Sequence, residues 1–392
     1  MALHESVKEN LGTVRKHLED VSLRTSPKKS CISPNVTPDH GLKTTKVVQK
    51  LQLKEKEDSE FDPQLEPLLD GGANRFVIFP IHYPDIWDMY KKVEATFWTV
   101  QEVETEKDKK DWEEKLDDNQ KHFILNVLAF CAVSNGSINK TVIERFSQDI
   151  KLPEARSFYI FQNTIEGVHS IMYSLHLKTC TSDPKEKVSL FTAIKTLPSM
   201  KKKINFTLKW IDHEGPNFPE RVVALAAVKG IFLSSSFAAM FWLKKQGVMP
   251  GLTFSNDLIS RDKELLCDFA CLMFKHIVQK PSFERVKQII QDAVVIEKEF
   301  LTEALPVNLI GMNSELVCKY IECVADRLFI ALGYAKVYNS ENPFPFMNVT
   351  SREVATNVFE KKITEYKKFG VAEEDSQKKN IQSAGVVFGV NF

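Results

Sequence analysis

Hydrophobic residues recur at helical spacing along most of the chain. In residues 154–180 the apolar positions lie three or four residues apart, as one face of a helix requires. No proline occurs between Pro84 and Pro153, and a proline-free run of that length favours long helices. Further helices are predicted over 220–245, 258–278, 283–305 and 313–332, with a loop or helix break at 249–257. Strand patterns are nearly absent, so the sequence predicts an all-α fold.

The two ends of the chain have a different character from its middle. Residues 1–74 are polar, rich in proline and without a sustained period, which predicts a disordered tail. Residues 75–355 form the predicted helical body, and residues 356–392 form a second, flexible tail. Within the first tail, Ser26-Pro27-Lys28-Lys29 resembles a proline-directed kinase site and Lys8-Glu9-Asn10 a degradation signal, and both short matches are equally compatible with chance.

The segment Val222–Leu243 is long and apolar enough to be weighed as a membrane span. It contains Lys229 and a run of three serines near its middle, and the chain supplies no second span. A helix that is apolar on all sides is buried in something, and here we expect a protein core rather than a membrane. The opening residues MALHESVKEN lack the apolar core of a secretory signal, so we expect a cytoplasmic protein.

Composition sharpens this picture. The 392 residues include 15 Gly and 27 Phe, which favours long helices packed through aromatic rings. Lys plus Arg number 52 and Asp plus Glu also number 52, so the chain has no excess positive charge to attract nucleic acid or an anionic membrane. The seven cysteines include no Cys-x-x-Cys pair, which is consistent with a reducing compartment.

One helix carries a motif that is able to support chemistry. Glu166, His169 and Tyr173 are spaced i, i+3 and i+7, so a carboxylate, an imidazole and a phenol share one helix face. A single Glu-x-x-His is weak evidence, because a solvated Glu beside a satisfied His is common. In a helical bundle, however, dimetal sites use one Glu from each of two helices and a Glu-x-x-His from each of the other two. A dimetal site would therefore need matching ligands from three other helices.

Several long runs resemble one protein family. The chain is similar to the small, radical-generating subunit of class I ribonucleotide reductase, eukaryotic type, over roughly residues 75–370. The runs that carry the resemblance are RFVIFPIHYPDIWDMYKKVEATFWT, ERFSQDIKLPEARSFYIFQ, VVALAAVKGIFLSSSFAAMFWLKK, MPGLTFSNDLISRD, CDFACLMFKH, EFLTEALPVNLIGMN and YIECVADRLF. The resemblance implies a ferritin-like helical dimer in which a di-iron centre oxidises a tyrosine. It also implies a large-subunit partner that reduces ribonucleoside diphosphates for deoxyribonucleotide synthesis, DNA replication and repair.

The resemblance carries over to the site residues unevenly. Glu166, His169 and the radical tyrosine, Tyr173, match, and the first ligand falls on Glu104, a longer carboxylate than the family's Asp. Where the family places a Glu and a second Glu-x-x-His, this chain has Lys229, Lys263 and Leu266. The resemblance therefore implies a metal site with three of its ligands lost.

The substitutions change the electrostatics of the pocket. Four carboxylates in a low-dielectric interior need metal charge to offset their repulsion. With Lys229 and Lys263 facing Glu104 and Glu166, we interpret the ammonium groups as replacements for the metal ions. We expect no tightly bound cofactor and at most one weakly held metal. Two alternatives stay open: a helix shift that offers Glu264 and Cys267 as a replacement pair, and metal-free radical chemistry at Tyr173, as in some relatives of the family.

The family's radical-transfer route is better preserved. Trp87, Asp262 and His169 match its internal relay, and Tyr366 matches the tail tyrosine that passes the radical to the large subunit. Each has an ordinary structural interpretation as well, such as packing for Trp87. The last seven residues keep Phe388 and Phe392 as apolar anchors for the large subunit, but Gly389 and Asn391 stand where acidic residues are expected. We expect docking to be weakened or altered.

Three functional hypotheses follow. The leading one is a reductase small subunit with a degenerate site and no radical formation of its own, which acts as a structural or regulatory partner of an intact small subunit or pairs with itself. The second is an active small subunit that uses Tyr173 with metal-free or residual-metal chemistry. The third is a ferritin-like protein with an unrelated binding role, and the retained Trp87, Asp262 and Tyr366 argue against it.

Overall fold

The structure is a computed structural model that describes residues 61–70, 75, 77–212, 214–304 and 307–347. Within these residues the secondary structure is helical and contains no strand, as the sequence predicts. The α-helices are α2 (Pro84–Ala95), α3 (Glu106–Glu114), α4 (Asp118–Asp149), α5 (Pro153–Cys180), α6 (Pro184–Thr196), α7 (Pro198–Thr207), α8 (Phe218–Gly230), α9 (Ser234–Lys245), α10 (Pro250–His276), α11 (Phe283–Ala304) and α12 (Ser314–Ala331). A π-helical segment, Leu208–Asp212, continues α7.

Local sequence signals explain where the long helices begin. Asp117 and Gln120 form a capping box at the start of α4, in which each side chain accepts a hydrogen bond from the other residue's backbone N–H. Asn217 and Glu220 do the same at the start of α8. Proline occupies the first position of α5, where its missing N–H costs no intrahelical hydrogen bond. These signals set the ends of the helices but not how the helices pack.

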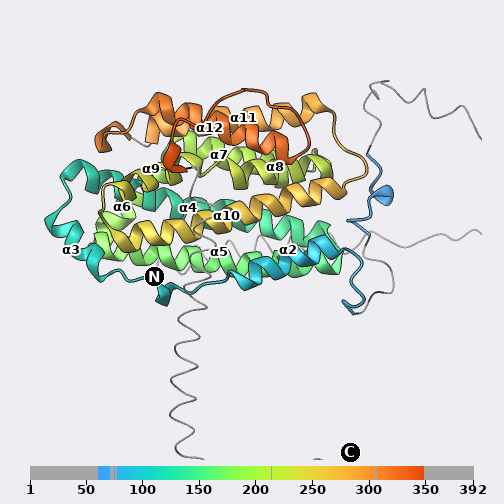
Figure 1. The fold of residues 1–392 in the computed structure, drawn as a ribbon, viewed down its shortest axis with the longest axis horizontal. Coiled ribbons are helices and arrows are strands. Elements are labelled where there is room, and N and C mark those ends of the chain that lie inside the picture. Colours follow the sequence, from blue (N-terminus) through green and yellow to red (C-terminus); the bar gives the residue numbers. More distant parts are fainter. Residues whose placement is uncertain (1–60, 71–74, 76, 213, 305–306, 348–392) are drawn as a thin grey trace, which may run out of the picture. The chain divides into compact units, whose positions relative to one another are not determined.

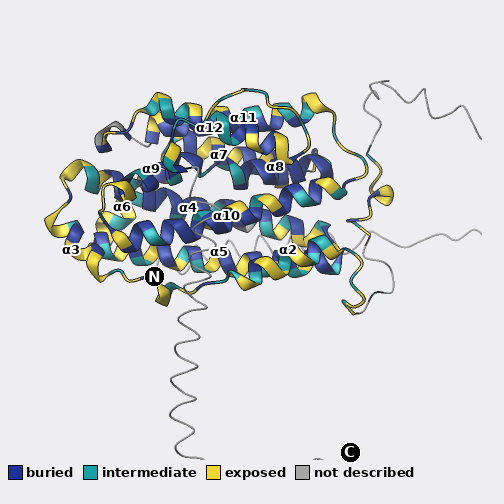
Figure 2. Cartoon of the chain, in the orientation of Figure 1, coloured by how far each residue is buried: buried dark blue, intermediate teal, exposed yellow. Residues whose placement is uncertain are grey.

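Helices α4, α5, α8 and α10 form the centre of the bundle (Figure 1). Helix α4 packs along α5, and α10 packs along α8. Helix α2 lies against α5 and α10, while α11 packs on α7, α8 and α12. The buried residues concentrate where these helices face one another, and the exposed residues lie on the outer faces and in the loops (Figure 2). The functional residues discussed below lie between α4, α5, α8 and α10.

The most apolar segment lies inside the bundle. In the part of the chain that the structure describes, Phe218–Lys245 alone is long and apolar enough to cross a membrane, and 83% of its most apolar window is buried within the protein. This burial agrees with the predicted core helix. The segment is not one continuous helix, however, because the α-helical pattern is interrupted at residues 231–233 between α8 and α9. Lys203 stabilises this interruption, because its Nζ donates a 2.7 Å hydrogen bond to the Phe232 carbonyl oxygen.

The predicted loop or helix break at 249–257 is correct only at its first residue, because the break lies at residues 246–249, between α9 and α10. Helix α10 already begins at Pro250, so the rest of the predicted segment forms its first turns. The Asp108 carboxylate accepts hydrogen bonds of 2.7 Å from the backbone N–H groups of Gly251 and Leu252, which would otherwise lack partners at a helix start. This cap comes from α3, distant in sequence, so no local signal predicted it. The predicted tails, 1–74 and 356–392, lie almost entirely outside the described residues.

Candidate functional site

Six buried polar side chains from the four central helices meet in one cluster. They are Asn135 and Asn139 of α4, Glu166 and His169 of α5, Lys229 of α8 and Lys263 of α10, and none is more than 7% exposed. Each central helix supplies at least one member, which is the ligand geometry of a bundle metal site. The chemical groups are different, because the cluster contains two amides and two ammonium groups but only one carboxylate.

The Glu166 carboxylate lies between the two ammonium groups. Its Oε1 accepts a 2.9 Å hydrogen bond from Lys229 Nζ, and its Oε2 accepts one from Lys263 Nζ. Burial alone would raise the pKa of Glu166, but the charges of Lys229 and Lys263 outweigh it and hold that pKa well below its usual value. Burial lowers the pKa of Lys229 to about 8, although Glu166 opposes the change. The cluster is therefore a buried ion triad.

The two asparagines fix the geometry of this triad. Lys229 Nζ donates to Asn139 Oδ1 over 2.6 Å, and Lys263 Nζ donates to Asn135 Oδ1 over 3.2 Å. Asn139 Nδ2 donates to Glu166 Oε2, and Asn135 Nδ2 donates to the backbone oxygen of Glu166, each over 2.8 Å. Both amide groups thus act as donor and acceptor, which a carboxylate could not do. Asn139 bridges the Glu166 carboxylate and the Lys229 ammonium, and Asn135 bridges the Glu166 backbone oxygen and the Lys263 ammonium.

A second hydrogen-bonded chain leads away from the cluster through His169. His169 Nε2 lies 2.9 Å from Asp262 Oδ2, which also accepts a 2.7 Å hydrogen bond from the indole Nε1 of Trp98. Asp262 Oδ1 accepts a 2.9 Å hydrogen bond from Arg261. Burial would raise the pKa of Asp262, yet His169 and Arg261 bring it below its usual value. Trp98, Asp262 and His169 form a continuous buried path of hydrogen bonds.

Tyr173 lies one turn beyond His169 on α5 and is buried. Burial raises the pKa of its phenol well above the usual value, and the neighbouring Cys131 and Glu166 add to this effect. Its Oη makes no hydrogen bond of standard geometry within the described residues. It lines a small cavity together with Ser236 and Asn256, each of which also has a buried polar atom without a described partner. A neutral phenol is the form that this environment favours.

Two residues expected in the site lie elsewhere. Glu104 lies in the loop before α3 with its side chain exposed, so the prediction that it faces Glu166 is wrong. Trp87 is only half-buried and packs against Phe79 and Tyr90, with ring centroids 6.0 Å and 4.9 Å away. Trp98, not Trp87, donates to Asp262. The first ligand position, which the sequence analysis assigned to Glu104, is therefore occupied by Asn135 of α4.

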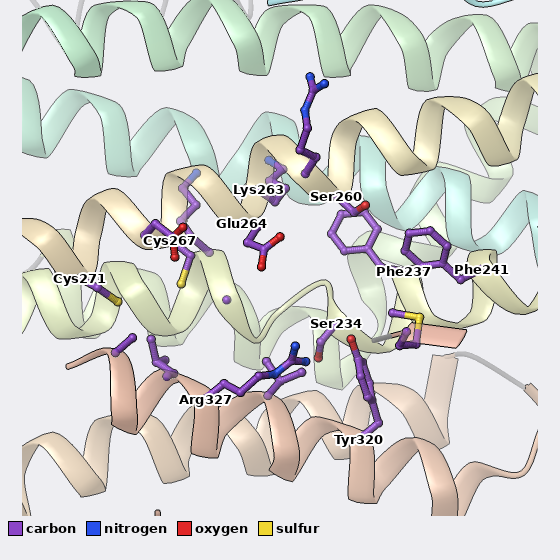
Figure 3. A pocket seen from close by; sticks show the side chains of 18 residues that line it. Ser234, Phe237, Phe241, Ser260, Lys263, Glu264, Cys267, Cys271, Tyr320 and Arg327 are labelled. Atoms are coloured by element: carbon purple, nitrogen blue, oxygen red, sulfur yellow. The ribbon is translucent and has the colours of Figure 1, made fainter. Parts of the chain in front are cut away.

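The structure does not support the helix shift that would offer Glu264 and Cys267 as replacement ligands. Leu266 is a buried core residue and offers no donor. Glu264 is exposed, and Cys267 Sγ lies 3.6 Å from the Ala226 carbonyl oxygen. Figure 3 shows Glu264 and Cys267 on the side of α10 that faces Arg327 of α12, where they line a groove. Lys263 lines the same groove, but of these three side chains it is the one that binds Glu166. The replacement pair therefore does not reach the cluster.

Three predicted residues, Tyr366, Phe388 and Phe392, lie outside the described residues. Sequence reasoning missed two residues, Asn135, which had a weak signal, and Trp98, which had none. Asn135 and Asn139 are an i, i+4 pair of amides on α4, and a bundle metal site requires a contribution from a fourth helix. The surrounding residues 134–141 are mostly polar, so the pair does not stand out there. Trp98 adjoins an aromatic run, where nothing in the sequence distinguishes it from a core residue.

The cluster does not fit a dimetal centre. Among the described residues no group of three or more His, Cys, Asp or Glu side chains is placed to hold a metal ion. Both oxygens of Glu166 already bind ammonium groups, and His169 Nδ1, 3.5 Å from Glu166 Oε2, is the one unpaired ligand atom beside them. A protonated lysine offers no lone pair to a metal.

Comparison with known proteins now places the chain. Residues 75–343 match the family described as ribonucleotide reductase, small chain. The chain belongs to this family. It is 58% identical over 306 residues to human ribonucleoside-diphosphate reductase subunit M2, covering 78% of each chain. It is 57% identical over 311 residues to the small chain from vaccinia virus strain Ankara, covering 79% of this chain and 97% of the viral one.

Solved structures agree with this assignment to the small-chain family. The ribonucleotide reductase Rnr4 homodimer from Saccharomyces cerevisiae matches with a TM-score of 0.69 and 42% identity, covering 77% of this chain and 93% of that one. The ribonucleotide reductase R2 subunit from Clostridium botulinum, at 20% identity and a TM-score of 0.60, supports the fold alone. The predicted family and the ferritin-like all-α fold are confirmed, and the chain is a ribonucleoside-diphosphate reductase small subunit.

Proposed function

We propose that this small subunit assembles no dimetal centre of its own and serves as a structural or regulatory partner of an intact small subunit. The observation that carries the proposal is the ion triad of Glu166, Lys229 and Lys263. Two ammonium groups occupy the positions from which the second and third carboxylates of a bundle metal site would reach the centre. Their positive charge repels metal cations, and their hydrogen bonds keep the helices in place without metal.

A single metal ion would have to displace at least one ammonium group from Glu166. The remaining donors would be the Glu166 carboxylate, His169 Nδ1 and the amide oxygens of Asn135 and Asn139. That set resembles a weak site at best, because the displaced lysine would then be a buried cation without its carboxylate. We therefore propose at most one weakly bound metal and no radical formed through it.

Metal analysis combined with electron paramagnetic resonance of the purified protein tests the proposal. The expected result is less than one iron or manganese per chain and no tyrosyl signal after exposure to ferrous iron and oxygen. Stoichiometric iron with a tyrosyl signal would contradict it. A gain-of-site variant sharpens the test: Asn135→Asp, Lys229→Glu, Lys263→Glu and Leu266→His together should increase metal uptake. A control with two exposed lysines changed, Lys202→Glu and Lys209→Glu, alters the net charge without building a site.

The partner surface is proposed on the outer face of α5. Between Arg156 and Lys178 the exposed positions of this helix carry no charged residue; they are Ile160, Asn163, Thr164, Gly167, Ile171 and Ser174. Ile160 is 67% exposed and Ile171 is 52% exposed. A long uncharged stripe with large exposed apolar side chains is a surface that another chain would cover. We assign it to a second small subunit, either another copy or an intact paralogue.

The structure of the Rnr4 homodimer supports this choice, because that relative of the small-subunit family pairs with itself. Ile160→Glu combined with Ile171→Glu should shift the protein from dimer to monomer in light scattering after size exclusion. Val188→Glu, at a residue of α6 that is 66% exposed, is the matched control and should leave the dimer intact. A variant that stays fully dimeric would place the interface elsewhere.

Metal-free radical chemistry at Tyr173 is the second candidate function. The path Trp98–Asp262–His169 favours it, because this path is intact although the metal ligands are not. A tyrosyl signal from metal-free protein would support this candidate, and its loss in Tyr173→Phe would locate the radical. Docking on a large subunit through Phe388 and Phe392 stays a prediction. Competition by a peptide of residues 383–392 for the large subunit tests it.

A further inference from the structure

Within the described residues, the buried ion triad has two ammonium groups for one carboxylate. Lys229 and Lys263 share the single carboxylate of Glu166, and the nearby Asp262 is already paired with Arg261 at 2.9 Å. With His169 counted as neutral, these five charged groups sum to +1, and protonation of His169 would increase the excess. All of them are at most 7% exposed. An excess of buried charge is unfavourable, so an anion that bound here would stabilise the cluster.

Each ammonium group also has an N–H donor to spare. A lysine ammonium has three N–H donors. Lys229 Nζ has two acceptors, Asn139 Oδ1 and Glu166 Oε1, and Lys263 Nζ has two, Asn135 Oδ1 and Glu166 Oε2. Within the described part of the chain no third acceptor is present for either nitrogen. Two unused donors of like charge therefore lie on the same cluster.

A small cavity lies beside the same groups. Lys229, Lys263, Asn135 and Asn139 line it together with Ser134 and apolar side chains of α4 and of the segment that joins α8 to α9. The volume of the cavity is about 20 Å³, which is room for one small ion or water molecule. Phosphate or a carboxylic acid is too large for it. The cavity combines the right size, unused donors and excess charge.

We propose that this cavity is a halide-sized anion site, in which chloride binds between Lys229 Nζ and Lys263 Nζ. The anion neutralises the excess charge of the triad and accepts the two unused N–H bonds. The inference depends on the proposed absence of a metal centre, because metal ions at the cluster would reverse its charge. It extends that proposal by naming a ligand: the cluster binds an anion where a bundle metal site would bind cations.

Bromide soaked into crystals of the full chain tests the site directly. A single anomalous peak in the cavity, within hydrogen-bond reach of both Nζ atoms, is the expected result. A cavity that holds only water at high bromide concentration would overturn the proposal. The metal content of the same preparation separates the two ideas. Bound metal without bromide refutes both, and the absence of metal and bromide together refutes the anion site alone.

Stability in solution provides a second test. The melting temperature of the wild-type chain should be higher in sodium chloride than in sodium gluconate at equal ionic strength, because a ligand that binds the folded state stabilises it. Lys229→Gln and Lys263→Gln each remove the excess charge and should abolish this difference. Lys202→Gln, at an exposed ion pair, should retain it. Equal chloride dependence in Lys229→Gln and Lys202→Gln would overturn the proposal.

Discussion

Replacing Glu166 by Gln tests the electrostatics of the cluster most directly. Gln has the shape of Glu but no charge, so Lys229 and Lys263 would become two buried ammonium groups without a carboxylate. Removing one partner of a buried ion pair costs about 3–5 kcal/mol. Because folded domains are stable by only about 5–15 kcal/mol, the loss would be a large fraction of the total. We expect the free energy of unfolding to fall by about 3–5 kcal/mol.

The sign of this change separates two descriptions of the site. In a metal-free cluster of carboxylates, deleting one carboxylate relieves repulsion and stabilises the protein. In the ion triad, the same deletion destabilises it. Urea denaturation at pH 7, followed by tryptophan fluorescence, measures the difference. Glu299→Gln is the control, because it breaks the exposed Lys202–Glu299 pair at 2.6 Å, which contributes about 0–1 kcal/mol.

The pH dependence gives an independent check on Glu166. Its pKa is lowered in the folded state, so its contribution to stability is fully present above the unfolded pKa of about 4.5 and is lost as the pH falls through the folded pKa. The Gln variant should lack this component of acid denaturation. Adding Lys229→Met and Lys263→Met should restore much of the lost stability. A Glu166→Gln protein as stable as the wild type would refute the triad.

Three further predictions concern the surroundings of the cluster. Because burial lowers the pKa of Lys229 to about 8 from 10.5, the unfolded chain binds more protons between these values, and stability should rise with pH there by up to about 1.4 kcal/mol per unit. Denaturation at several pH values should show that Lys229→Met lacks this rise. Trp98→Phe should cost about 1.5–3 kcal/mol of unfolding free energy, because it removes a hydrogen bond to the buried Asp262 carboxylate, whereas Trp87→Phe should cost less. A larger cost at Trp87 would argue against the assigned path. Gly251→Ala should destabilise the fold by about 1–3 kcal/mol, because its Cβ would lie 2.2 Å from the Glu104 backbone oxygen. Gly136→Ala meets no atom within 4 Å, so thermal unfolding should show it unchanged or about 0.5–1 kcal/mol more stable.

Helix content was predictable because it depends on local pattern. The spacing of apolar residues in 154–180 and the proline after Leu152 predicted α5 closely, and α11 and α12 followed in the same way. The start of α10 was not predictable, because its cap is Asp108, more than 140 residues earlier in the chain. Local sequence shows a Pro-Gly pair there, which usually marks a turn.

The sequence by itself determined the family, the helical bundle and the presence of two lysines where a metal site needs carboxylates. Each of these depends on residue identity or on spacing within one helix. Only the tertiary structure decided which helix completes the cluster and which tryptophan joins the path, because residues such as Asn135 and Trp98 acquire their partners through packing of distant segments. It also decided the charge balance. Glu104 is exposed, and the triad therefore has one carboxylate for two ammonium groups instead of two for two.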